Sequence, residues 1–253
     1  MLLFFYDKTF EGLLTAVFEA YSRKSFPDKL LGEGDIPPLF VEEIFTVVTD
    51  EEKSSRVWTA LEKKLSKGAC NMLTHVWLSE EKDSDGLLFR YIRKAIDAPI
   101  SIETNFADSD VLLMHQIARR VSHEGLYLKQ FIRFQKASDD IFFAAVSPQS
   151  NAMPLVIDHF KDRFADQKWV IYDLKRKYGY YYNLHTCEEM TLEDDTHLLS
   201  GKLDENILAE DEKMFQELWK GYFKSMTIKE RINLKLQRQH MPKRFWKYLT
   251  EKQ

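Results

Sequence analysis

The chain has 253 residues, of which 44% are hydrophobic and 13% aromatic, and its formal net charge is −4. A hydrophobic fraction of this size supports a packed core, so the composition excludes an intrinsically disordered chain. The apolar run at the N-terminus is too short for a secretion signal or a membrane span. Cys70 and Cys187 match no metal-binding spacing and suit a reducing compartment. We therefore expect a cytoplasmic protein with no membrane contact, no metal and no cofactor.

The first 130 residues are predicted to form a mainly helical half. A short buried strand over residues 2–6 precedes a helix that Thr9 can cap, because apolar residues then recur at helical spacing. Asp50 can cap a second helix, and Asp108 opens the longest helical pattern. The other elements predicted here are a loop at 32–38, a strand at 45–49, and helices at 69–78 and 86–96.

Residues 131–192 show strand patterns instead. The predicted elements are strands at 131–134 and 141–146, a helix at 153–164, strands at 169–172 and 178–182, and a strand at 188–192. The order of a hairpin, a helix and a second hairpin favours neighbouring antiparallel strands. The sequence therefore predicts an α+β fold with a mostly antiparallel sheet covered by helices.

The last part of the chain, residues 208–253, is predicted to be a basic helical segment, called the C-terminal segment below. A helix over 210–226 has a wide apolar face, and Thr227 with Glu230 forms a capping-box pattern that would start another helix. Pro242 fits the first turn of a last helix over 242–250. No Gly/Ser-rich or Pro-rich linker interrupts the chain, so we expect a single domain over residues 1–253.

Charge is segregated along the second half of the sequence. Residues 185–217 contain eleven acids and two bases, whereas residues 220–253 contain ten bases and two acids. Cations neutralise phosphates and aromatic faces stack on unpaired bases, so the basic block suits nucleic acid. The candidate binding residues are Arg231, Lys235, Arg238, Lys243, Arg244, Trp246 and Lys247. An equally weighted alternative is a basic face that docks on the acidic segment after Leu192, which is predicted to be an exposed connection.

Two smaller groups add candidates. Lys175 and Arg176 lie in the predicted turn before a run of tyrosines, where a positive hairpin tip could hold a nucleic-acid strand. His159 and Arg163 share one helix face and form a candidate polar site, in which His159 could act as a general base. Solvated turn residues and exposed polar helix residues are the plainer interpretations of both groups. The pattern identifies no catalytic residue.

Nearly the whole chain resembles a bacterial family described as "probable DNA metabolism protein". The resemblance is carried by residues 6–21, 131–134, 159–164, 169–173 and 241–246. It implies a genomic partnership with a radical S-adenosylmethionine protein that is similar to DNA photoproduct repair enzymes. It also implies that some relatives are fused to a uracil-DNA glycosylase-like domain. The chain departs from the family pattern at Leu126, Tyr127 and Gln130, where a His-Arg pair and a Gly are expected, and this departure favours a non-catalytic role.

Three hypotheses follow from the residues and the resemblance. The leading one is a DNA-binding accessory protein in DNA modification or repair that acts with a radical SAM partner. The second is a nucleic-acid-processing enzyme of glycosylase or nuclease type, which predicts a pocket of converging polar groups. The third is a protein-interaction scaffold, which predicts a large exposed apolar patch around Phe245 and Tyr248.

Overall fold

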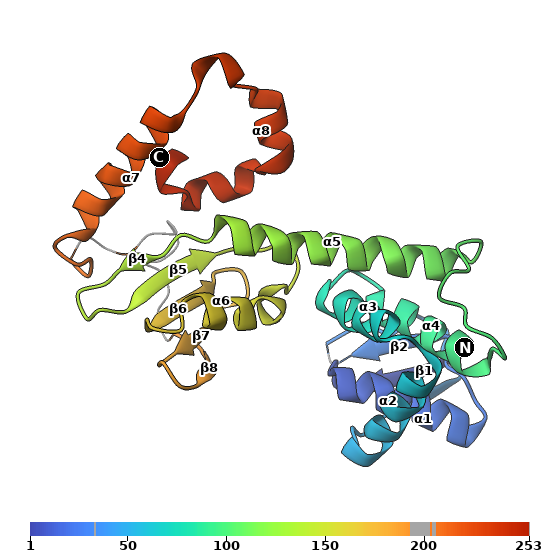
Figure 1. The fold of residues 1–253 in the computed structure, drawn as a ribbon. Coiled ribbons are helices and arrows are strands. Elements are labelled where there is room, and N and C mark those ends of the chain that lie inside the picture. Colours follow the sequence, from blue (N-terminus) through green and yellow to red (C-terminus); the bar gives the residue numbers. More distant parts are fainter. Residues whose placement is uncertain (33, 193–202, 204–205, 253) are drawn as a thin grey trace. The chain divides into compact units, whose positions relative to one another are not determined.

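The computed structural model describes residues 1–32, 34–192, 203 and 206–252 (Figure 1). Its chain contacts group into two compact units, Met1–Ser122 and His123–Gln253. The boundary between them falls inside the long helix α5, Ser109–Phe131. The single domain that the sequence suggests stays a prediction.

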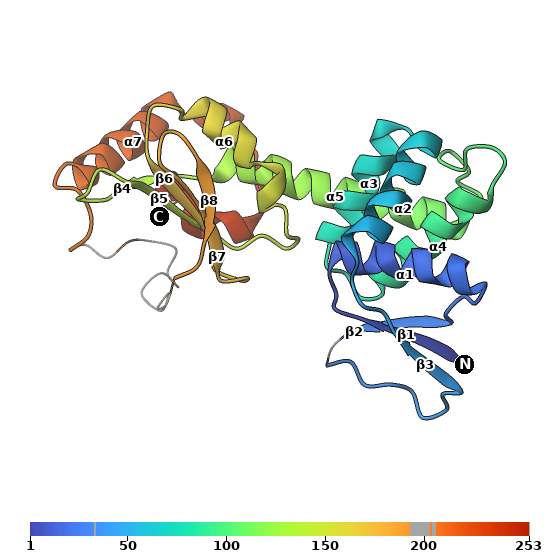
Figure 2. The same cartoon turned by 90° about the horizontal axis from the view of Figure 1, so that it is seen from below.

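The first unit contains a parallel sheet of three strands in the order β2-β1-β3. Strand β1 is Leu2–Tyr6, as predicted, and it pairs in parallel with β2 (Lys29–Gly32) and β3 (Glu43–Thr46). Figure 2 shows the three strands side by side with helix α1 across one face. Strand β2 was not predicted, because its few apolar residues run directly into a loop-like composition.

Three helices of this unit begin at the capping or opening residues that were predicted, and the other two, α3 and α4, each begin two residues before the predicted start. Thr9 Oγ1 accepts a hydrogen bond from the Gly12 N–H and starts α1, Phe10–Arg23. Asp50 accepts from the Lys53 N–H and starts α2, Glu51–Lys64. Helices α3 (Lys67–Leu78) and α4 (Ser84–Asp97) follow, and the Asp108 carboxylate accepts from the first N–H groups of α5. The helical prediction for this part of the chain is confirmed.

The second unit contains a five-stranded sheet in the order β4-β5-β6-β7-β8. Its strands are β4 (Gln135–Lys136), β5 (Phe142–Val146), β6 (Trp169–Asp173), β7 (Tyr178–Tyr182) and β8 (Cys187–Met190). Three of the four pairings among these strands are antiparallel, which confirms the predicted α+β class. Strands β5 and β6 are parallel, because helix α6 (Ile157–Arg163) connects them as a crossover.

One predicted strand is wrong. Residues 131–134 do not form a strand, since Phe131 is the last residue of α5 and β4 begins only at Gln135. The apolar residues at 131–134 favour a buried strand, but Phe131 and Ile132 are buried in the core of this unit at the end of α5. A short apolar run has no period of its own that separates helix from strand.

The core of the second unit includes the end of the chain. Trp169 is fully buried beside Phe160 and Tyr182, and the same cluster contains Phe245 and Tyr248 from the 3₁₀ turn Lys243–Tyr248. Phe245 is 2% exposed and Tyr248 7%. The prediction of an exposed apolar patch around these two residues is therefore wrong, because both side chains are buried in the core.

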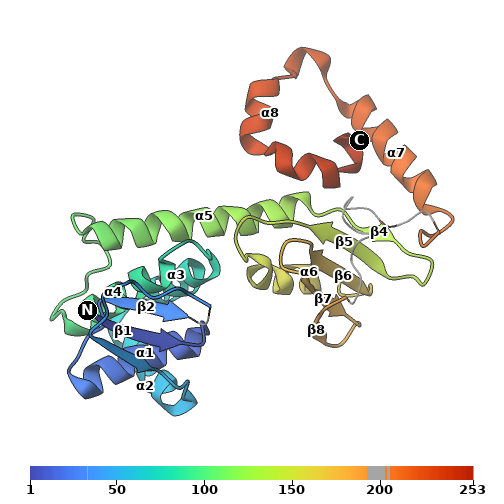
Figure 3. The same ribbon diagram turned by 180° about the vertical axis from the view of Figure 1, so that it is seen from behind.

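Before the 3₁₀ turn Lys243–Tyr248, the C-terminal segment forms α7 (Glu212–Met226), the 3₁₀ turn Lys229–Arg231 and α8 (Leu234–His240), as Figure 3 shows. The predicted capping box at Thr227 is wrong. The Thr227 hydroxyl donates back to the Phe223 carbonyl at 2.6 Å, so it ends α7 and does not start a helix. Pro242 immediately precedes the 3₁₀ turn Lys243–Tyr248 and does not lie within its first turn.

Candidate nucleic-acid interface

Four of the predicted binding residues are exposed and have no ion pair among the described residues: Arg231, Lys235, Arg238 and Lys243. Lys235 and Arg238 lie three residues apart on α8, so they share one helix face. Helix α8 starts here because Asn233 Oδ1 accepts from the Leu236 N–H at 3.0 Å. The alternative prediction was that the basic block docks on the acidic segment after Leu192. Much of that segment, residues 193–202 and 204–205, lies outside the described residues.

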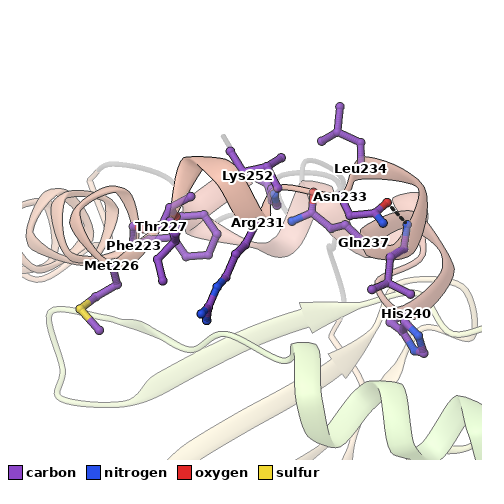
Figure 4. A pocket seen from close by; sticks show the side chains of 12 residues that line it. Phe223, Met226, Thr227, Arg231, Asn233, Leu234, Gln237, His240 and Lys252 are labelled. Carbon is purple, nitrogen blue, oxygen red and sulfur yellow. Dashed lines mark hydrogen bonds between the residues drawn. The ribbon is translucent and has the colours of Figure 1, made fainter.

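A groove lies between the end of α7, the turn at 229–231, α8 and the 3₁₀ turn Thr250–Lys252, and we call it the α7–α8 groove. Its volume is about 690 Å³ and its walls are mainly apolar. Figure 4 shows the lining, which comprises Phe223, Met226, Thr227, Ile228, Arg231, Ile232, Asn233, Leu234, Leu236, Gln237, His240 and Lys252. The groove thus combines an aromatic ring, aliphatic walls and cationic or titratable side chains.

Trp246, the predicted stacking residue, does not line this groove. Its indole N–H donates to the Met241 carbonyl at 3.0 Å, and the Lys252 ammonium lies 5.3 Å from its ring centre. The same ammonium lies 5.4 Å from the ring centre of Phe223, which is half-buried in the groove wall. Phe223 is therefore the aromatic ring that the groove itself offers to a base.

Arg244 has an internal partner. Its guanidinium forms an ion pair with the buried Glu124 carboxylate of α5, and it lies over the rings of Tyr127 and Phe245. The neighbouring Lys247 ammonium is 4.7 Å from the ring centre of Tyr248. These contacts give Arg244 a structural role that its place in the basic block did not indicate.

The turn between β6 and β7 holds its own cations in place. Arg176 pairs with the buried Asp173 at 2.8 Å and donates to the Pro148 and Gln149 carbonyls. Lys175 Nζ also donates to the Gln149 carbonyl, at 2.8 Å. The predicted hairpin is confirmed by the β6–β7 pairing. Its two basic side chains connect the turn to the loop at 148–149, which leaves Arg176 only slightly exposed.

His159 and Arg163 lie on α6, as predicted, but their contacts there are with aromatic rings. The His159 ring packs edge-on against Phe160, and the Arg163 guanidinium lies 5.6 Å from the centre of the Phe164 ring. Within the described ranges, no group of three or more His, Cys, Asp or Glu side chains is arranged to hold a metal ion.

A polar pocket in the first unit was missed by sequence reasoning. It brings His75 of α3 together with Glu103, His115 and Arg119, from the loop before α5 and from α5 itself. His115 Nε2 lies 2.9 Å from the Glu103 carbonyl oxygen, and the Glu103 carboxylate accepts from the Ser66 N–H and hydroxyl. These residues are up to 53 positions apart in the sequence, so no local spacing could reveal the pocket.

Glu251 anchors the end of the C-terminal segment. Its nearly buried carboxylate accepts from the Trp219 indole N–H at 2.9 Å and pairs with Arg133 at 3.0 Å. Burial alone would raise the pKa of this carboxyl, but the hydrogen bond from Trp219 and the Arg133 charge hold the pKa below its ordinary value. The anchor therefore favours the folded state when the carboxyl is ionised.

Removing this anchor is expected to change the pH dependence of stability. A folded-state pKa below the unfolded value gives stability that is present above about pH 4.3 and is lost as the pH falls through the folded pKa. Glu251→Gln should therefore cost about 2 kcal/mol at pH 7 and less at pH 3. Urea denaturation between pH 7 and pH 3 measures this difference. Glu230→Gln, an exposed control on the same segment, should have the same free energy of unfolding as the wild type at every pH. If the loss of stability in Glu251→Gln is the same at pH 7 and pH 3, the ionised anchor is contradicted.

Comparisons with known proteins give the family of the chain. The model of a domain of unknown function, DUF4130, matches residues 82–251, and the chain therefore belongs to the DUF4130 family. The solved pGpG-specific phosphodiesterase PggH from Vibrio cholerae has a TM-score of 0.40 and 10% sequence identity, over 89% of this chain and 99% of that chain. This similarity is too low to support an inference about activity. No curated protein matches the chain. Among the described helices, none has the length and apolar character needed to cross a membrane.

Proposed function

We propose that this DUF4130 protein binds DNA through its C-terminal segment and presents the DNA to a partner enzyme during modification or repair. The observation that carries the proposal is the position of Arg231, Lys235 and Arg238. Arg231 lines the α7–α8 groove, whereas Lys235 and Arg238 are exposed on α8 outside its lining, and none of the three has an ion pair among the described residues. Unpaired surface cations gain free energy from phosphates by releasing condensed counterions.

The groove supports a preference for single-stranded DNA. Its walls are apolar and include the Phe223 ring, while Arg231 and Lys252 line the same space. An unpaired base can enter an apolar groove and stack on an aromatic ring, which contributes about 1–3 kcal/mol per base. The bases of a duplex are already stacked and paired, so they cannot use this surface without first being displaced.

The accessory role is supported by the resemblance to the DNA-metabolism family. That resemblance implies a radical SAM enzyme as the partner that performs the chemistry on DNA. The anchoring pairs at Glu124 and Glu251 would hold the C-terminal segment in place while the partner acts. The proposed DNA-contacting residues do not include Arg244, Lys175 and Arg176. The charged groups of these three side chains already form hydrogen bonds or ion pairs within the chain.

A salt titration of DNA binding tests the proposal. If Arg231, Lys235, Arg238 and Lys243 each neutralise one phosphate, the slope of log affinity against log salt should be about −3 on single strands. Changing Arg231, Lys235 and Arg238 together to Gln should reduce that slope by about 2 and weaken binding at low salt. Fluorescence anisotropy with a labelled oligonucleotide gives both quantities.

The matched control carries the same change in charge elsewhere. Lys63, Lys67 and Lys82 are exposed in the first unit and have no ion pair among the residues described. Their triple change to Gln should leave the slope unaltered. A flat salt response of the wild type, or an equal effect in the control variant, would reject DNA binding by the C-terminal segment.

The polar pocket at His75, Glu103, His115 and Arg119 favours a second candidate function, a nucleic-acid-processing enzyme. Titratable groups that converge in a pocket are the usual setting of acid–base chemistry. Incubation with intact and damaged oligonucleotides, with and without a divalent metal, separates the two functions. Product formation that His115→Gln abolishes would support the enzyme, whereas binding without turnover supports the accessory role.

A further inference from the structure

Helix α7 exposes an apolar stripe that the described part of the chain does not cover. Met214, Leu218, Tyr222 and Met226 recur every four residues, so they form one stripe on the helix. They are 55%, 60%, 55% and 63% exposed, respectively. An exposed apolar surface of this kind marks an interaction site.

The face of α7 next to the stripe contacts the C-terminal turn. The Trp219 indole N–H donates to Glu251, and the Lys252 ammonium lies over the Phe223 ring. These contacts fix which side of the helix faces the C-terminal turn. Tyr222 packs against the Trp219 ring, with ring centres 5.7 Å apart, and Met226 lines the α7–α8 groove, yet all four residues of the stripe are more than half exposed and leave room for a further occupant.

Gly221 lies beside the middle of the stripe. A glycine inside a helix costs about 1 kcal/mol relative to alanine. A Cβ atom built at Gly221 would meet nothing within 4 Å, so no contact within the described chain requires a glycine here. A glycine on a helix surface does, however, allow the backbone of a second helix to approach closely. This observation points to a helical occupant.

The charges on α7 suit a copy of the same helix in the opposite direction. Glu217 and Lys224 are seven residues apart and lie together on the edge of the stripe next to Gly221. In an antiparallel pair centred on Lys220, Glu217 of each copy would lie beside Lys224 of the other. In a parallel two-fold pair this edge of each helix would lie on opposite sides of the interface, so Glu217 and Lys224 of the two copies could not meet.

The same register aligns the apolar residues. With the two-fold axis beside Lys220, Met214 lies opposite Met226 of the second copy, and Leu218 lies opposite Tyr222. A two-fold interface of this kind is self-complementary, because each contact occurs twice. We propose that α7 pairs with α7 of a second copy as an antiparallel dimer, with two Glu217–Lys224 ion pairs at its edge.

Sedimentation equilibrium of the full chain without DNA tests this inference. The wild type is expected to show a concentration-dependent dimer. Leu218→Asp should abolish the dimer, because it places a charge in the apolar interface. Leu112→Asp on α5, at a leucine that is also exposed, should leave the dimer unchanged. Circular dichroism shows whether each variant remains folded.

A charge swap tests the antiparallel register itself. Glu217→Lys and Lys224→Glu should each raise the dimer dissociation constant about tenfold, since each change makes two attractive pairs repulsive. The double variant should return to within about threefold of the wild type. Gly221→Ala should raise the melting temperature of the monomer and still weaken the dimer, a combination that a purely structural glycine would not produce.

The outcomes of these measurements are distinct. A monomer at all accessible concentrations, or single charge variants that dimerise like the wild type, would overturn the proposal. Loss of DNA affinity in Leu218→Asp without any dimer in the wild type would assign the stripe to DNA and also overturn it. Failure of DNA binding leaves the dimer result unaffected, because the dimer is measured without DNA.

Discussion

Arg244→Ala is expected to reduce the free energy of unfolding of the second unit by about 3 kcal/mol. The Glu124 carboxylate is 4% exposed and has two partners, the Gln149 N–H and the Arg244 guanidinium. Without Arg244 the carboxylate stays buried with no counter-charge, and breaking a buried pair in this way costs about 3–5 kcal/mol. The packing of the guanidinium on Tyr127 and Phe245 would be lost as well.

Two further variants isolate the ion pair. Lys243→Ala, at the exposed neighbouring position, should change stability by less than about 0.5 kcal/mol. Adding Glu124→Gln to Arg244→Ala should recover at least about 1 kcal/mol, because the buried charge is then removed. Urea denaturation of the four proteins measures these differences. If Arg244→Ala weakens DNA binding and leaves stability unchanged, then Arg244 contacts phosphate and the structural role is wrong.

Gly179→Ala is expected to destabilise the sheet of the second unit by about 3 kcal/mol. Gly179 lies opposite Tyr172 in the β6–β7 pairing. A Cβ atom at this position would lie 2.5 Å from the Ile171 carbonyl oxygen and 3.0 Å from Tyr172 Cα. These are backbone atoms of the neighbouring strand, which cannot move without disturbing the ladder, so the cost should reach the upper part of the range for overpacking.

A glycine in open surroundings provides the control. At Gly68 in the first turns of α3, a new Cβ would meet only Ser66 Oγ, at an ordinary 3.7 Å. Gly68→Ala should therefore be neutral or stabilise the protein by up to about 1 kcal/mol, through helix propensity. Chemical denaturation of both variants checks the prediction. Equal effects at the two positions would show that β6 and β7 can separate enough to accept a side chain.

Much of the local structure was predictable because its signals are local. Thr9 and Asp50 accept hydrogen bonds from N–H groups three residues later, so the few residues around each cap are sufficient to start a helix. The hairpin of β6 and β7 is another case, since its strands are separated by a four-residue turn. Thr227 had an equally suitable pattern but bonds back to Phe223, because a hydroxyl can satisfy either neighbour.

The candidate site could be predicted only in part. Arg231, Lys235 and Arg238 were found from charge and composition, and the structure leaves them exposed. Arg244 has the same charge four residues before Tyr248, yet it pairs with Glu124, which lies 120 positions earlier in the chain. Composition does not distinguish an exposed cation from a paired one, because it contains no information about which distant segment each side chain contacts.

Local signals in the sequence were enough for the starts of α1, α2 and α5, most strands, the α+β class and the position of the basic block. Each of these follows from hydrogen bonds, periodicity or charge within a short stretch of chain. Only the packing of distant segments places β1 between two parallel strands, buries Phe245 in the core, and leaves the stripe on α7 uncovered by the described residues. These outcomes depend on which distant segments share a surface, and burial is a property of that shared surface and not of any one segment.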